Sequence, residues 1–279
     1  MEEIVAIPAC FTNNHAPDQG ISFVPYLSAT PANRGRVSLT RHMISLITEG
    51  EKIMHVENQT LHLTPKRIPL LASGNVLFTE RLGNNQRIKS TMIFFDDQVL
   101  HAALAQSDKP EKQNARLPYL MFERDDYLLG FVDSVNILLE QDLLSPALQQ
   151  AKLTELLLYL NGKHPGLLAQ LLTKAIAKPE EERLRQVMEA HLSAQLTLSE
   201  LAFLCHMSLP TFKRKFEQIY QQSPARWLQI QRLTLAANRL RSKSAKPGEV
   251  YLEAGYENHS SFSKAFKQYF GVLPKDFTY

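Results

Sequence analysis

Short runs of strand-like sequence fill the first part of the chain. They occupy residues 37–48, 55–63, 68–71, 75–78 and 87–95, and turn-forming sequences such as Glu49-Gly50-Glu51 and Ser73-Gly74 separate them. Short strands with turn signals about every ten residues are typical of an antiparallel sandwich or barrel. Pro8, Pro17, Pro25 and Pro31 lie before these runs, so the opening stretch is expected to be irregular, with an edge strand or two.

After Asp97 the apolar positions recur at helical spacing. The pattern predicts a short helix at 99–105, a connector at 117–120, helices at 127–141 and 146–160, and a further helical segment at 166–177. Ser145 and Pro146 supply an N-cap and a first helical residue. These helices could cover the chain's own sheet or join two subunits. Packing on the sheet is favoured, although both can hold together.

From Glu181 onward the pattern predicts helices only, at 181–191, 198–204, 209–220, 225–241, 249–254 and 259–270, with a final turn at 275–278. An all-helical segment behind a β-rich one predicts two domains. We place them at residues 1–178 and 179–279.

Composition narrows the class of protein. The chain has 279 residues, of which 44% are hydrophobic and 21% charged, so it is globular rather than disordered or fibrous. The sequence lacks an apolar run near the ~20 residues that a membrane helix needs, and its acidic start is unlike a signal peptide. Cys10 and Cys205 are too few for a disulfide framework and are interpreted as small buried hydrophobes, so we expect a cytoplasmic protein.

Charge becomes informative only when the chain is divided. The net charge of the whole is +3, but residues 1–179 carry −1 and residues 180–279 carry +4. Without the acidic cluster at 180–182, the last 97 residues reach +7. A basic half favours nucleic acid or another anionic surface as partner, although a solvated helical surface is an equal alternative on charge alone.

A repeat in the basic half supplies a sharper signal. Residues 210–224 and 260–274 match at an offset of 50, with Phe212 pairing with Phe262 and Phe216 with Phe266. The aromatic residues form an inward stripe in each copy. The outward faces carry hydroxyls, an imidazole and cations, which suit phosphates and base edges. These residues are Thr211, Lys213, Arg214 and Lys215 in the first copy and His259, Ser260, Ser263, Lys264 and Lys267 in the second.

A short helix and a tight turn precede each copy. In the first copy, residues 198–204 lead through a turn to Ser208, which is a good N-cap for the next helix. Ala202 permits close helix crossing, and His206 lies where a helix end favours a left-handed residue. This is the plan of a helix-turn-helix, whose second helix enters the major groove.

The basic half resembles the AraC/XylS family of transcriptional regulators over residues 183–279. The resemblance lies in LSELAFLCHMSLPTFKRKFEQIYQQSPARWLQIQRLTLAANRL and in EAGYENHSSFSKAFKQYFGVLPKDF. It implies that recognition positions fall at Thr211, Lys213 and Arg214 in the first motif and at His259, Ser260, Ser263 and Lys264 in the second. Tyr251 stands where the family has a small Ala, and Pro247 where it has an apolar residue. Both departures predict a shortened or tilted supporting helix in the second motif.

A linker helix at 225–241 joins the motifs. Its 17 residues would span about 25 Å, which could hold two recognition helices about one DNA turn apart. Part of its basic residues would contact phosphates and part would lie on the surface, while Arg232 matches a structural position in the family. The basic residues are Arg226, Arg232, Arg239, Arg241 and Lys243.

The amino-terminal half is similar, more weakly, to the family's cupin-like sensing domain over residues 42–82. Many cupins are metal enzymes, which need an H-x-H pair, a Glu and a later His. The chain has no H-x-H, and His55 and His62 are seven apart, which puts them on opposite strand faces. We therefore expect no metal, no cofactor and no enzyme activity. The regulatory ligand could be a small molecule or a protein, or the protein could respond to no ligand at all.

The predicted fold class is α+β: an N-terminal cupin-like antiparallel β-barrel with flanking dimerisation helices at 127–141 and 146–161, and a C-terminal all-α domain with two helix-turn-helix motifs at 198–220 and 249–270. The predicted function is a sequence-specific DNA-binding transcription activator. Its expected partners are double-stranded DNA, RNA polymerase and a second copy of itself. The alternatives are a cupin-type metal enzyme or a protein-docking module with an accessory helical domain.

Overall fold

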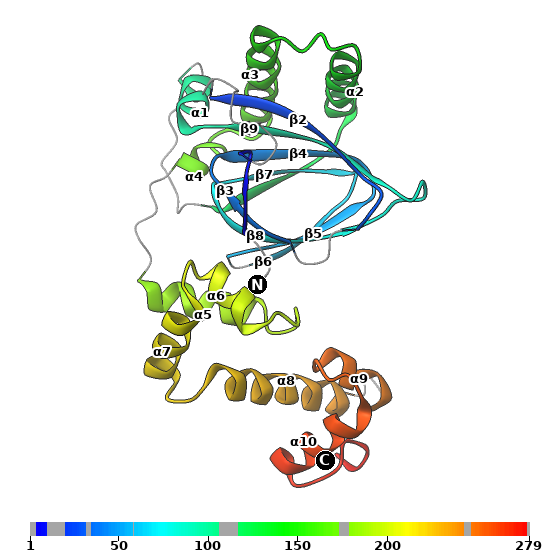
Figure 1. The fold of residues 1–279 in the computed structure, drawn as a ribbon, viewed down its shortest axis with the longest axis vertical. Coiled ribbons are helices and arrows are strands. Elements are labelled where there is room, and N and C mark those ends of the chain that lie inside the picture. The colour runs from blue at the N-terminus through cyan, green and yellow to red at the C-terminus, as the bar shows by residue number, and fades with distance from the viewer. Residues whose placement is uncertain are drawn as a thin grey trace. The chain divides into compact units, whose positions relative to one another are not determined.

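The computed structural model describes residues 4–9, 20–31, 35–57, 59–105, 117–172, 179–242 and 247–277. The chain divides into two compact units, one built mainly from the first 177 residues and the other mainly from residue 178 onward. Figure 1 labels most of their elements. Each unit is described by itself.

Ten strands of the N-terminal unit form two five-stranded sheets. One sheet has the order β1-β3-β8-β5-β6 and the other β10-β7-β4-β9-β2. Strand β1 runs parallel to β3, whereas β9 is antiparallel to β2 and β4. The strands are β1 (Ile4–Ile7), β2 (Ile21–Ser28), β3 (Gly35–Leu39), β4 (His42–Glu49), β5 (Glu51–Val56), β6 (Gln59–Leu63), β7 (Arg67–Leu71), β8 (Gly74–Arg81), β9 (Ile88–Phe95) and β10 (Tyr119–Glu123).

The predicted closed antiparallel barrel is corrected to two separate sheets among the described strands, one of which contains a parallel pair. Each predicted run at 37–48 and 55–63 covers parts of two strands, because Thr40–Arg41 separate β3 from β4, and β5 ends at Val56 before β6 begins at Gln59. The predicted connector at 117–120 is the beginning of β10, which pairs with β7. The opening stretch, predicted to be irregular with an edge strand or two, contains β1 and β2, which are indeed edge strands of their sheets.

The sheet containing β4 is covered on both faces, which explains why β4 is apolar at successive positions. Met43 and Ile47 belong to the apolar layer shared with the other sheet. Ile44 and Leu46 point the other way, into a layer shared with helices. Side chains alternate across a strand, so a strand buried on both faces loses the alternating polar pattern.

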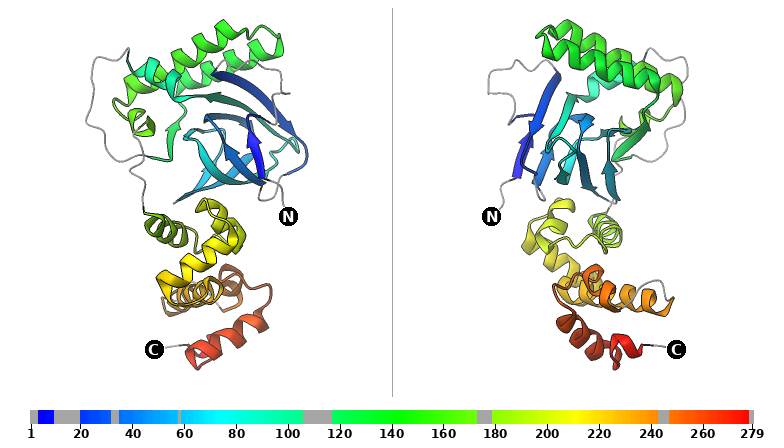
Figure 2. Two further views of the ribbon diagram at one scale, coloured as in Figure 1. Left: turned by 60° about the vertical axis from the view of Figure 1, so that its left-hand side comes forward. Right: turned by 90° about the vertical axis from the view of Figure 1, so that its right-hand side faces the viewer.

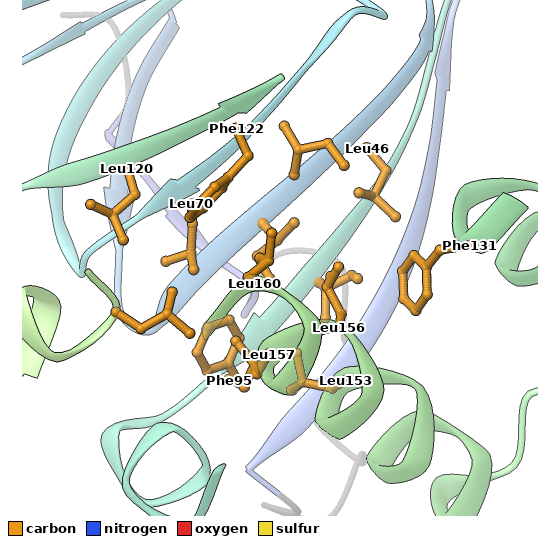
Figure 3. Close-up of a cluster of buried hydrophobic side chains, with 14 of the residues drawn as sticks. Leu46, Leu70, Phe95, Leu120, Phe122, Phe131, Leu153, Leu156, Leu157 and Leu160 are labelled. Atoms are coloured by element: carbon orange, nitrogen blue, oxygen red, sulfur yellow. The ribbon is translucent and has the colours of Figure 1, made fainter. Parts of the chain in front are cut away.

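The described part of this unit also contains the helices α1 (Asp97–Leu104), α2 (Asp126–Glu140), α3 (Pro146–Lys163) and α4 (Ala169–Leu172). Both views in Figure 2 show α2 and α3, in green, over one side of the sheets. Figure 3 shows Leu153, Leu156 and Leu160 of α3 facing Leu70 and Phe95 of the sheet. The favoured packing of these helices on the chain's own sheet is thus confirmed. Residues 173–177 of the predicted segment 166–177 lie outside the described part.

A buried ionic network lies between the two sheets. Lys52 of β5 has its Nζ 3.2 Å from Oε1 of Glu80 on β8, and both side chains are buried. Tyr26 of β2 donates a hydrogen bond of 2.9 Å to Glu80 and places its ring beneath the ammonium group, 4.5 Å from Nζ. Burial lowers the pKa of Lys52. The pKa of Tyr26 is raised to about 12, mainly by burial and to a smaller extent by the negative charge of the neighbouring Glu80. The network connects the sheets by polar contacts within an apolar layer.

All described elements of the C-terminal unit are helical: α5 (Glu180–Ala190), α6 (Leu198–Leu204), α7 (Leu209–Tyr220), α8 (Pro224–Arg241), α9 (Pro247–Glu253), α10 (His259–Phe270) and the 3-10 turn η1 (Pro274–Asp276). These bounds lie within two residues of the predicted ones. Figure 1 shows α8 as the long helix between α7 and the pair α9 and α10. Of all described helices, none has the length and apolar character that crossing a membrane requires.

Candidate nucleic-acid interface

The first helix pair, α6 and α7, begins with reciprocal capping. Thr197 accepts a hydrogen bond from the amide of Glu200, and the Glu200 carboxylate accepts one of 2.6 Å from the amide of Thr197. Such a capping box fixes the start of a short helix that could not form alone. The turn after α6 contains His206 in the left-handed region, at φ 58°. The predicted left-handed position is therefore confirmed.

The second pair, α9 and α10, repeats the same turn with a small shift. Gly255 takes the left-handed position at φ 79°. The N-caps of α7 and α10, Ser208 and Asn258, lie 50 residues apart in the sequence. The equivalent backbone amides whose hydrogen bonds end α6 and α9 lie only 49 residues apart. These bonds are Cys205 to Leu201, His206 to Phe203 and Met207 to Ala202 after α6, and Ala254 to Val250, Gly255 to Leu252 and Tyr256 to Tyr251 after α9.

One extra residue, Glu257, therefore lies in the second turn, before the repeat of residues 210–224 and 260–274, whose predicted offset of 50 is unaffected. The predicted shortening of the second supporting helix is wrong. Helix α9 has seven residues, as α6 has. Pro247 is its first residue, a position at which the missing amide donor costs nothing.

Aromatic residues anchor both second helices in matching ways. Phe216 meets the Trp227 ring edge-on, with centroids 5.7 Å apart. Phe266 meets Phe277 edge-on at 5.2 Å. Trp227 and Phe277, which also lie 50 residues apart, thus pack against their helices in the same way. These aromatic side chains include four that are fully buried: Phe212, Phe216, Phe262 and Phe266. Their burial determines which faces of α7 and α10 stay exposed to solvent.

The exposed face of α7 is centred on Arg214. Phe212 and Phe216 point inward, so Arg214, which lies two residues from each, points outward. Lys213 is also exposed, and Thr211 is half-buried near the start of the helix. Ser208 is exposed, donates to the Thr211 hydroxyl at 2.9 Å and caps the Thr211 amide. The first turn therefore presents hydroxyl groups beside the two cations.

Lys215 differs from its predicted neighbours. Its side chain is 28% exposed and its Nζ forms an ion pair with the Glu180 carboxylate at the start of α5. The position of Lys215 on the helix places it beside Phe212 and Phe216 rather than opposite them. The acidic cluster that opens the basic half thus neutralises one of the predicted site residues.

The exposed face of α10 is centred on Lys264, which occupies the position of Arg214 in the repeat. Ser260 and Lys267 are exposed on the same face. His259 and Ser263 lie at its border toward α9, with His259 Nδ1 and Ser263 Oγ 3.3 Å apart. The nine residues predicted on the outward faces, and Ser208 as the tenth predicted DNA-binding residue, are thus in or beside α7 and α10. Their contacts with DNA stay a prediction.

The basic residues of α8 lie partly on the surface and partly in contacts within the unit, and their predicted contacts with phosphates stay a prediction. Arg226 is exposed. Arg239 is paired with Glu253 of α9, and the Arg241 guanidinium lies 5.6 Å from the Phe277 ring centre. Arg232 donates to the Leu192 carbonyl at 3.3 Å, which is a structural placement. Lys243 lies outside the described residues.

Few other side chains in the described ranges are candidates for a metal, catalytic or ligand-binding site. They contain no group of three His, Cys, Asp or Glu side chains that could hold a metal ion. His55 is buried and His62 exposed, on β5 and β6. Cys205 is buried in the first turn, and burial raises its pKa to about 12. A hollow of about 290 Å³ where α1 begins is lined by polar residues, including His42, whose Nε2 is 2.6 Å from Asp97 Oδ1.

Both units match known protein families. Residues 42–170 match the family described as ExsA N-terminal regulatory domain, and residues 201–278 match the family described as helix-turn-helix domain. The chain is 25% identical to the HTH-type transcriptional regulator ExsA of Pseudomonas aeruginosa, over 83% of this chain and 84% of that protein. It is 29% identical to the virulence regulon transcriptional activator VirF of Yersinia enterocolitica, over 56% of this chain and 58% of VirF.

Among solved structures, fatty-acid-bound ToxT of Vibrio cholerae matches with a TM-score of 0.39 at 11% identity, over 92% of this chain and 93% of ToxT. The two units and the paired helical motifs define an α+β protein with a helix-turn-helix domain. The chain combines an N-terminal domain of the ExsA type with an AraC-type helix-turn-helix domain, and is similar in both to transcriptional regulators of the AraC family. The curated relatives named above are regulators, which speaks against the metal-enzyme alternative.

Proposed function

We propose that this protein is a sequence-specific DNA-binding transcription activator. Residues 179–279 would bind DNA through motifs at 198–220 and 249–270, and residues 1–178 would regulate and dimerise. One observation carries the proposal: the repeat exposes a cation at the same position of each second helix, Arg214 in α7 and Lys264 in α10, between buried aromatic anchors. VirF, the Yersinia relative, is itself named a transcriptional activator.

In this proposal α7 and α10 enter successive major grooves. Arg214 suits guanine, since guanidinium groups bond O6 and N7 together, and Lys264 suits the same acceptors or a phosphate. Ser208, Thr211, Ser260 and Ser263 add hydroxyl donors near the helix starts. Helix α8, at 18 residues, spans about 27 Å, which is compatible with motifs about one DNA turn apart. Lys213 and Lys267 would contact phosphates.

Dimerisation would use α2 and α3. Their outward sides carry exposed apolar residues, which a monomer would leave in water: Leu129, Ile137, Leu148 and Leu158 are 47%, 53%, 38% and 37% exposed. Two-fold dimers match paired half-sites. Changing Ile137 to Glu should convert a dimer to a monomer in sedimentation velocity, and a dimer that survives Ile137→Glu contradicts this interface.

The N-terminal unit would receive the regulatory signal. Its cupin-like character is part of this proposal, and its effector is either a small ligand or a protein. The hollow beside His42 and Asp97 could hold a small polar molecule, because its lining offers both donors and acceptors. RNA polymerase would be the downstream partner of the DNA-bound protein.

The proposal is tested with the full-length protein and a pool of random duplexes. Repeated selection should enrich one bipartite sequence with two half-sites about one turn apart. A promoter carrying that sequence should be transcribed more strongly by bacterial RNA polymerase when the protein is added. Failure to enrich any sequence would contradict specific DNA binding, and enrichment without increased transcription would contradict the activator role. Stoichiometric bound metal in the purified protein would favour the enzyme alternative.

A further inference from the structure

One pair of residues distinguishes the second motif from the first. The Tyr251 ring of α9 meets the His259 imidazole edge-on, with centroids 5.9 Å apart and planes at 84°. In the first motif the corresponding positions, by the hydrogen-bond pattern of the supporting helices and the N-caps of the second helices, are Ala202 and Leu209. The two positions therefore change together, from small and aliphatic to aromatic and imidazole.

His259 is held by three neighbours although its side chain is exposed. Besides Tyr251, the Phe262 ring lies 6.4 Å away, and the Ser263 hydroxyl is 3.3 Å from Nδ1. Edge-to-face packing and a hydrogen bond to one ring nitrogen fix the rotation of an imidazole. When Ser263 donates to Nδ1, the proton of the neutral ring lies on Nε2. A fully protonated ring also carries a proton there, so Nε2 is a donor in both states.

The longer turn accompanies this arrangement. Glu257 is the residue that the second turn has in addition, and it follows the amide of Tyr256 that closes α9. Helix α9 keeps the same closing hydrogen bonds as α6 despite the larger side chain at position 251. Tyr251 is thus accommodated without loss of these closing hydrogen bonds, and its ring lies beside the first residue of α10.

We propose that Tyr251 is a positioning residue that holds His259 for a hydrogen bond to a base in the major groove, with guanine, which offers N7 and O6, as the best match. The inference rests on the proposed function. Leu209 has no polar atom in its side chain, so α7 makes no equivalent contact. The two half-sites would then differ, and the one bound by α10 would require a G·C pair where His259 reaches.

The test uses full-length protein and the duplex that the wild-type chain selects from a random pool. Dissociation constants are measured for every single base-pair change, with the wild type, His259→Ala, Tyr251→Ala, Tyr251→Phe and the double variant Tyr251→Ala/His259→Ala. His259→Ala should lose about tenfold of discrimination at one G·C pair. Tyr251→Ala should lose the same preference, Tyr251→Phe should keep it, and the double variant should lose no more than either alanine variant.

That guanine can be replaced by 7-deazaguanine or 7-deazahypoxanthine, both of which lack N7. The replacement should weaken DNA binding by the wild type and leave binding by His259→Ala unchanged. The inference is overturned if Tyr251→Ala keeps the wild-type preference, weakens all sequences equally, or adds its full effect to that of His259→Ala. A wild type without any sequence preference would instead overturn the proposed function itself. Since His259 is exposed, His259→Ala tests the base contact even if Tyr251→Ala unfolds the motif.

Discussion

Lys215 of α7 forms an ion pair with Glu180, the first residue of α5, and this pair ties the second helix of the first motif to the acidic start of the helical unit. A lysine that is neutralised by a carboxylate contributes less to phosphate binding than a free one. Glu180 and a DNA phosphate would compete for the same ammonium group.

We therefore expect Glu180→Gln to tighten DNA binding and to steepen its dependence on salt, by about 0.9 in the slope of log K against log[salt] if one phosphate contact is gained. Glu182→Gln is the matched control, because Glu182 belongs to the same acidic cluster but bonds Gln186 instead. Fluorescence anisotropy at several salt concentrations measures both. Equal effects of the two variants would show that only net charge matters.

Substitution of Gly255 should destabilise the protein, because its backbone is left-handed and the Arg232 side chain lies close to it. Gly255 has φ 79°, and a Cβ there would lie 3.0 Å from Nη1 of Arg232. Gly255→Ala should lower the free energy of unfolding by about 1–3 kcal/mol. Trp227, the only tryptophan of the chain and buried in α8, reports unfolding of this unit by fluorescence.

Gly248→Ala is the control for Gly255→Ala, since a Cβ at position 248 meets nothing within 4 Å and the backbone there is helical. It should leave stability unchanged or raise it slightly. Equal losses at the two glycines would contradict the special role of the turn.

The buried pair in the N-terminal unit should be sensitive to the loss of one partner. Lys52→Met leaves the Glu80 carboxylate buried without its cation, which should cost about 3–5 kcal/mol. Arg67→Met breaks the exposed pair with Glu123 and should cost at most about 1 kcal/mol. Calorimetric unfolding measures both, and Lys52→Met/Glu80→Leu should recover most of the loss. A Lys52→Met effect no larger than that of Arg67→Met would contradict the account.

Cys205 should be unreactive in the folded protein. Burial raises the pKa of its thiol to about 12, so the reactive thiolate stays rare at pH 9, where a free cysteine with a pKa of about 8.5 is mostly ionised. In a Cys10→Ser background, alkylation at pH 9 should be slow in buffer and fast in urea. Fast alkylation of the native protein with the pH dependence of a free thiol would contradict the assigned burial.

The helical unit could be predicted closely because its signals are local. Ser208 and Asn258 cap their helices, and Phe212 and Phe262 mark the buried faces at fixed spacing. The extra Glu257 escaped the repeat comparison because the sequence match lies in the second helices. It becomes visible only through the hydrogen bonds of the turn.

The β-rich unit could be predicted only as a class. Strand pairing is non-local: β10 pairs with β7 across some fifty residues, and the short run around Leu120 gives no signal of this. The same limit applies at the site, because Lys215 looks like its neighbours in sequence and differs by its pairing with distant Glu180.

The central claim is that α7 and α10 bind DNA through the equivalent residues Arg214 and Lys264, and equilibrium binding of full-length variants to the selected duplex tests it most directly. Arg214→Ala and Lys264→Ala should each weaken binding by about 1–3 kcal/mol if they contact bases, or lower the salt slope by about 0.9 if they contact phosphates. Lys66→Ala, an exposed lysine of the other unit, should change neither quantity. A double variant, Arg214→Ala/Lys264→Ala, that binds the duplex as the wild type does at every salt concentration would contradict the account.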